Sequence, residues 1–173
     1  MRPEQAQIMA AYNEWINSRL YAVCAELSDV ERRQDRTAFF KSIHGTLNHL
    51  LLADKVWLGR FFDEPFHVEG LDQELFHGLE ELRRARDETD RQILQWAATL
   101  TDEVLAGTLS YTSISNPAPR TCEMWLAVTH FFNHQTHHRG QLTAMLSQCG
   151  KDYGVTDLIA LPQVVEQSAT HTV

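Results

Sequence analysis

The sequence has 173 residues, of which 43% are hydrophobic and 22% charged, and its formal net charge is −8 at pH 7. This length fits one domain, residues 1–173, with a single core, and no apolar run reaches the roughly 18 residues that cross a bilayer, so we expect no membrane partner. A negative chain whose arginines are interleaved with acids repels a phosphate backbone, so we also expect no nucleic-acid partner.

The first part of the chain predicts a helix over residues 3–27, where apolar side chains recur at spacings of three and four. Pro3 suits the first turn of this helix because its missing N–H is harmless there. The basic start and apolar block of a signal peptide are not found here, so we expect a cytoplasmic protein. Residues 28–40 are charged and aperiodic, which predicts a connection with at most a short turn of helix.

Two more helices are predicted in the middle of the chain. The second covers residues 42–62, with Ser42 or Thr37 as its N-cap. The third covers residues 72–100 and carries acids and arginines that we place on its outer side. This pattern indicates a mainly structural helix.

The segment of residues 101–120 has a different character. Its LSYTSI run is β-branched and aromatic, and NPAP cannot be helical, so a short extended segment and a turn are predicted. The fourth helix is expected from Thr121, with Thr121 or the turn at Arg120 as its cap, to about Cys149, where Gly150 ends it. The weakly patterned residues 163–173 predict a frayed tail.

Four long helices with short or moderate connections predict an all-α fold, a four-helix bundle with a short extended segment before the last long helix. Metal sites in such bundles lie between facing helices. The three cysteines share no CxxC spacing, which argues against a disulfide framework and a cysteine zinc site.

Residues 130–141, HFFNHQTHHRGQ, contain four of the nine histidines. On a helix they fall within a sector of roughly 100° on the apolar side, together with a glutamine. A single core histidine is more often a hydrogen-bonded structural residue, but several imidazoles buried without partners would each cost about 1 to 3 kcal/mol. A divalent metal ion is therefore predicted.

The spacing of the histidines indicates which of them could bind this ion. His134 and His138, four residues apart, can both reach one ion at about 2.0 to 2.1 Å. His130 and His134 share this spacing.

A third ligand is expected from another helix, because two ligands from one helix leave the site too open. The second helix offers His44 and His49. Periodicity slightly favours His44, since His49 lies toward the edge of the apolar stripe. The pattern alone leaves both histidines open as ligands.

Two segments, SIHGTLNHLLLADKVWLGRFF and THFFNHQTHHRGQLTAML, resemble the DinB family within the wider DinB/YfiT-like superfamily of metal-binding bundles. The resemblance extends from the first helix to about residue 161. It implies an up-down-down-up bundle whose metal is bound by three histidines, which correspond here to His49, His134 and His138.

Under this resemblance the remaining polar residues of the two segments take other roles. His130 and His137 become neighbours of the ion and are the nearest candidates for a catalytic base. Candidates to orient the ligand imidazoles through their second nitrogen are Gln141, Asn133 and Asp54. Arg139 is either an outward-facing helix charge or a contact to the ligands or to a substrate anion.

Three neutral histidines leave a divalent ion with its full charge and an open position, which is the arrangement of catalytic sites. Such an ion can lower the pKa of bound water or activate a thiolate. Histidine ligands suit zinc or nickel best, and also iron or copper.

The wider superfamily includes mycothiol-dependent isomerases and bacillithiol transferases, so the resemblance implies a metal-dependent thiol S-transferase acting on a small-molecule electrophile. A metal-dependent hydrolase that uses metal-bound hydroxide is the second hypothesis. A non-catalytic metal-binding stress-response protein is the third. Since relatives are commonly homodimers, a homodimer is expected.

Overall fold

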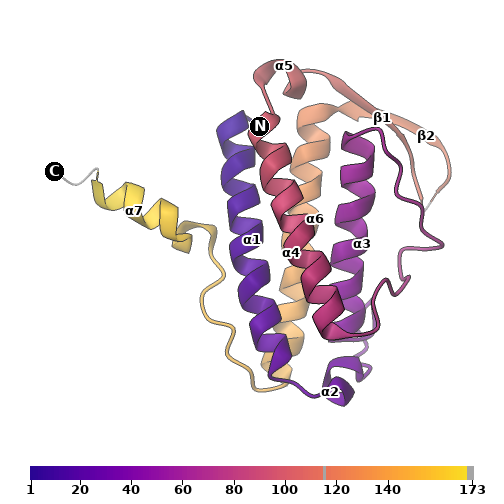
Figure 1. Ribbon diagram of the computed structural model, residues 1–173, viewed down its shortest axis with the longest axis vertical. Helices are drawn as coiled ribbons and strands as arrows, with labels where there is room; N and C mark the ends of the chain where they lie inside the picture. The colour runs from indigo at the N-terminus through magenta and orange to yellow at the C-terminus, as the bar shows by residue number, and fades with distance from the viewer. Residues whose placement is uncertain (115, 171–173) are drawn as a thin grey trace.

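The computed structural model of the protein describes residues 1–114 and 116–170 and is mostly helical. Four long helices lie side by side (Figure 1): α1 (Pro3–Ala25), α3 (Ile43–Phe61), α4 (Leu79–Thr99) and α6 (Met124–Gln148). Both α1 and α3 pack against α4 and against α6, so each long helix contacts two others. The segment between α3 and α4 runs back along the helices in Figure 1, and α3 and α4 therefore point in the same direction.

Shorter elements connect and extend the long helices: α2 (Asp29–Arg33), α5 (Asp102–Leu105), β1 (Thr108–Thr112), β2 (Pro119–Glu123), the 3-10 helix η1 (Leu158–Ala160) and α7 (Pro162–Thr170). The strands β1 and β2 form one antiparallel sheet that contacts α3 and α6. Figure 1 shows α7 extending away from the long helices, in the segment for which a frayed tail is expected. Residues 171–173 of that tail lie outside the described residues.

The predicted first and second helices agree with α1 and α3 to within two residues at each end. Ser42 is the N-cap of α3, since its hydroxyl accepts a hydrogen bond from the Gly45 N–H at 3.0 Å. Thr37 instead lies in the preceding turn, with a left-handed φ of 56°. None of the helices in the described part of the chain is both long enough and apolar enough to cross a membrane.

The start of α4 differs from the sequence prediction. Its first residue is Leu79, whereas the sequence predicts a helix from residue 72. The amide side chain of Asn48 explains the difference: its oxygen accepts hydrogen bonds from the N–H groups of Leu75 (2.8 Å) and Phe76 (3.0 Å). Because the Asn48 side chain on α3 accepts hydrogen bonds from these N–H groups, they do not require the carbonyl acceptors that a helix would provide.

The start of α6 also differs, because the predicted start at Thr121 is wrong. Residues of β2 pair with β1, with Ser110 opposite Thr121 and their hydroxyls 2.9 Å apart. The helix begins only at Met124, and Glu123 is its N-cap. The extended segment thus has a second strand, which its polar sequence did not indicate.

The core consists of two hydrophobic clusters that are stacked along the helices. One includes Ile16, Leu47 and Leu142, and the other includes Trp96 and Phe131. Each long helix also carries buried polar residues in the region where the two clusters meet. We call these residues the buried polar layer: Asn13, Asn17, Asp54, Arg86, Asp90, Gln135 and Arg139. The core is therefore crossed by a plane of charge and hydrogen bonds.

Candidate metal centre

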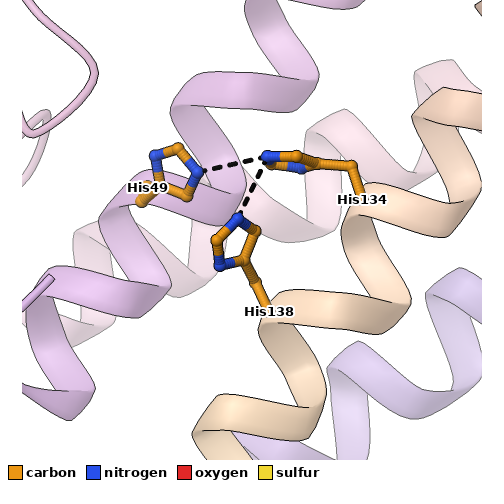
Figure 2. A group of neighbouring side chains, drawn as sticks. All are labelled: His49, His134 and His138. Carbon is orange, nitrogen blue, oxygen red and sulfur yellow. Dashed lines mark hydrogen bonds between the residues drawn. The ribbon is translucent and has the colours of Figure 1, made fainter. Parts of the chain in front are cut away.

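Three imidazoles from two helices converge on one point between α3 and α6 (Figure 2). The Nε2 atom of His134 lies 3.3 Å from Nε2 of His49 and 3.1 Å from Nε2 of His138. Ligands bound tetrahedrally at about 2.0 to 2.1 Å would lie about 3.3 to 3.4 Å apart. The three histidines are thus positioned to bind a metal ion.

Helix geometry and helix packing together bring these side chains into one place. His134 and His138 lie one turn apart on α6, so their side chains are stacked along one face of that helix. The amide of Gln135, next to His134, donates hydrogen bonds to the Asp54 carboxylate and to the Leu50 carbonyl on α3. This contact fixes how α6 lies against the helix that carries His49.

The second nitrogens of two of these imidazoles have acceptors that determine which nitrogen carries the proton. The Nδ1–H of His49 donates to the Leu71 carbonyl at 2.8 Å, and Nδ1 of His138 donates to the Gln141 side-chain oxygen at 2.9 Å. In these tautomers the lone pair of Nε2 faces the common point, as metal binding requires.

Burial keeps these imidazoles neutral. It lowers the pKa of His49 to about 4 and, with the neighbouring histidines, lowers the pKa of His134 to about 3. Burial also lowers the pKa of His138. Because the charged form of an imidazole is disfavoured in low dielectric, all three are in the metal-binding form at neutral pH.

We expect the free energy of unfolding of the metal-free protein to fall as the pH drops from about 6.5 toward about 4. In this window the unfolded chain protonates His49 and His134, whereas the folded chain does not. For His49 alone the loss is on the order of 3 kcal/mol. Urea unfolding at several pH values, with chelator present, measures it. The variant His49→Gln should show a weaker pH dependence, and an unchanged dependence would contradict the assignment.

The ring of Phe40 forms one side of the site, and the sequence did not predict this contact. The Phe40 ring stacks on the His49 ring with centroids 3.7 Å apart and meets His138 edge-on at 5.4 Å. The turn before α3 positions it, and Thr37 and Lys41 of that turn have left-handed φ values of 56° and 64°. Because the connection has no apolar period, the sequence offered no signal for this contact.

On another side of the site lies a cavity of about 280 Å³, whose wall includes His49 and His134. The aromatic rings of Trp57 and Tyr111 also line it. We call it the inner cavity. A ligand in this space would lie beside His49 and His134.

The two candidate bases lie in different surroundings. His130 lines the inner cavity, with its ring centroid 5.0 Å from that of Trp57 and 5.9 Å from that of His134. Both candidate bases are exposed, and Nε2 of His137 accepts a hydrogen bond from the Gln141 amide at 3.2 Å. The geometry therefore favours His130 over His137 as a group that could contact a substrate.

His44 lies apart from the three-histidine cluster. Its Nε2 is 3.0 Å from the Phe76 carbonyl and 3.4 Å from a Glu74 carboxylate oxygen, so it is bound to the segment before α4. Of the two alternatives that periodicity left open, the structure brings His49 to the other two histidines.

The remaining predicted neighbours of the ligands divide into two groups. Gln141 contacts His138 as the sequence suggests. Asn133 is exposed, and within the described residues it has no hydrogen bond to the three histidines. Asp54 and Arg139 belong to the buried polar layer instead, and within the described residues neither forms a hydrogen bond with the three histidines. Arg139, only 4% exposed, is not an outward-facing charge.

Two carboxylates and one guanidinium form the centre of the buried polar layer. Arg86 lies 2.6 Å from an Asp54 oxygen and 2.9 Å from an Asp90 oxygen. The prediction that the charges of the third helix are all on its outer side is therefore wrong. The spacing of Leu82, Arg86, Asp90 and Ile93 at three or four residues is the signal that places both charges on the buried face.

Replacing Gln141 with alanine should lower metal affinity by about 10- to 100-fold. The substitution removes the acceptor of the His138 Nδ1–H, so that the imidazole can change its tautomer and orientation. Competition with a chromophoric zinc chelator measures the change. Gln148→Ala makes the same chemical change at an exposed position of α6 and should leave affinity unaltered. Equal affinities of the two variants would exclude this role for Gln141.

Comparison with known proteins is consistent with this geometry. A model of the DinB family matches residues 3–168. Protein DinB of Bacillus subtilis (strain 168) is 29% identical over 157 residues, which cover 84% of this chain and 87% of that relative. The matched region includes all three histidines of the cluster.

Proposed function

This chain belongs to the DinB family, and we propose that it is a metal-dependent enzyme that activates a low-molecular-weight thiol for transfer to an electrophilic small molecule. The observation that carries the proposal is that two of the three clustered histidines, His49 and His134, lie in the wall of the inner cavity. Three neutral ligands would leave an ion its double positive charge and an open position for a ligand. We also propose the up-down-down-up four-helix bundle of the family, which the helix directions in Figure 1 support.

A divalent ion in this cluster would stabilise a thiolate at neutral pH. In the proposed reaction the sulfur forms a bond to the electrophilic carbon, and the bond from that carbon to its leaving group breaks. The electron pair departs with the leaving group. His130, in the cavity wall, is the group that we propose accepts the thiol proton.

The composition of the inner cavity favours a thiol over water as the nucleophile. None of the described residues that line it is a carboxylate, so no aspartate or glutamate is positioned there to deprotonate water. A metal-dependent hydrolase is the second candidate, and the observation in its favour is again His130, which could act as a base toward water.

We propose zinc or nickel as the metal, because a site of three imidazoles without thiolate or carboxylate suits both ions, with iron or copper as alternatives. Elemental analysis of the purified protein tests this assignment. The proposed partners are the thiol, a small-molecule electrophile and a second copy of the chain in a homodimer.

Consumption of a chromogenic electrophile such as chlorodinitrobenzene tests the proposed function, with a panel of small thiols and metal-loaded protein. We expect thiol-dependent turnover that His134→Ala abolishes. Hydrolysis of esters or amides without thiol would favour the second candidate. A metal-dependent rise in melting temperature without turnover of either class would favour a non-catalytic metal-binding protein and overturn the proposal.

A further inference from the structure

Arg60 is a cation in the wall of the inner cavity, on the same helix as His49. Its guanidinium carbon lies 4.4 Å from the ring centroid of Trp57 and 4.4 Å from that of Tyr111. One of its nitrogens donates a hydrogen bond to the Thr112 carbonyl at 3.3 Å. Contacts with two rings and the β1 backbone therefore restrain the position of the guanidinium.

The charge of Arg60 has no counter-ion within the described chain. No carboxylate of the described residues lies within 4.0 Å of its guanidinium, whereas the buried Arg86 contacts two. The side chain is partly buried, and this burial lowers the pKa of Arg60. In a protein with a net charge of −8, a partly desolvated cation without an acidic partner is available to pair with an anionic group of a ligand.

A second cavity, of about 530 Å³, adjoins the inner cavity at Arg60. We call it the outer cavity. The two share Val56, Arg60, Tyr111, Ser113 and Ile114 as wall residues, and the outer one extends between the segment after α3 and the β1–β2 hairpin. A ligand whose reacting end lies beside the histidines would pass Arg60 as it extends outward.

The outer cavity has charges of its own. Asp63 and Glu69 line it, and both carboxylates lie beyond ion-pair distance of Arg60. The inner cavity is lined by Arg60 and neutral imidazoles. An anionic group is therefore favoured at the junction and on the inner side, and disfavoured farther out.

We propose that Arg60 binds a carboxylate of the thiol substrate, so that the protein selects small thiols that carry a carboxylate group. The inference rests on the proposed function, since it places the sulfur at the three-histidine cluster. A guanidinium presents parallel N–H groups that match the two oxygens of a carboxylate. Because Trp57 and Tyr111 already restrain Arg60, little side-chain entropy is lost when the carboxylate binds.

Thiol binding to the cobalt(II)-loaded protein tests the inference without any turnover. The sulfur-to-cobalt charge-transfer band reports binding of straight-chain mercapto carboxylates, from mercaptoacetate to mercaptohexanoate, each compared with its primary amide. At the best chain length the wild-type protein should bind the acid about 10- to 100-fold more tightly than the amide. R60Q should bind the acid and the amide equally.

Two further variants distinguish carboxylate binding by the Arg60 guanidinium from the effect of the net charge of the protein. R60K keeps the charge without the planar fork and should retain part of the preference for the acid. R120Q removes the same charge from an exposed residue opposite Tyr111 in the hairpin and should keep the full preference. Melting temperature and cobalt affinity show whether R60Q is folded; if it is not, R60K alone decides, and an undiminished preference in R60K overturns the inference.

The outcomes distinguish this inference from the proposed function. Thiols that bind cobalt with no preference for the acid would overturn the role of Arg60 and leave thiol activation intact. An equal loss of preference in R120Q and R60Q would also overturn it, since net charge would then explain both. If no thiol produced the charge-transfer band, the proposed function would fail and this inference with it.

Discussion

Replacing His134 with alanine should abolish stoichiometric metal binding. Its Nε2 lies within 3.3 Å of Nε2 of both His49 and His138, so it is the common neighbour in the cluster. The variant retains one imidazole on each of two helices, which cannot hold an ion as three do. Because loss of a residue that merely orients a ligand costs 10- to 100-fold, we expect affinity to fall by more than about 100-fold. Metal analysis and chelator competition measure it.

The control for this prediction is His137→Ala, which removes an exposed imidazole from the adjacent turn of the same helix. It should bind metal almost as the wild type does. His44→Ala and His49→Ala form a second pair, and only His49→Ala should empty the site. If His44→Ala emptied it instead, the ligand set described above would be incorrect.

The two clustered histidines on α6 could be predicted from the sequence because their spacing alone determines that they share a face. The third could not be predicted from periodicity. Nearly every residue of α3 is buried, including both His44 and His49, so the helix has no distinct apolar stripe with a centre and an edge. Its rotation depends on contacts with α4 and α6, which a local pattern does not contain. The family resemblance indicated His49 where periodicity favoured the other histidine.

The starts of α4 and α6 were predicted too early for a similar reason. An amide side chain of α3 binds the backbone just before α4, and pairing with β1 keeps the residues before α6 extended. Both interactions join residues far apart in the sequence. Helix propensity and capping patterns describe only neighbours along the chain, so these boundaries lie beyond what they can predict.

The buried polar layer connects the stability of the fold to the geometry of the metal centre. Asp54 accepts a hydrogen bond from Gln135, the neighbour of His134, and also forms the ion pair with Arg86. The same layer therefore links α4 to α3 and α3 to α6. We infer that the layer holds α3 and α6 in the register that brings the three imidazoles together.

Arg86→Met should destabilise the protein by about 3 to 5 kcal/mol, because it leaves two carboxylates buried without their cation. Arg86 is 1% exposed, and Asp54 and Asp90 are its two partners. Urea unfolding measures the loss. Arg84→Met, at an exposed position of the same helix, makes the same chemical change and should alter stability by less than about 0.5 kcal/mol.

The pH dependence of Arg86→Met identifies the cause of that loss. Burial already raises the pKa of Asp54 to about 7 and raises the pKa of Asp90, while Arg86 lowers both. Without Arg86 the pKa of Asp54 should rise above its wild-type value of about 7, so above this pH the folded variant binds a proton that the folded wild type does not. Its deficit relative to the wild type should therefore shrink as the pH is lowered from about 9 to about 7. A deficit that is constant over this range would indicate lost packing, not uncompensated charge. Adding Asp54→Asn and Asp90→Asn should then restore part of the stability.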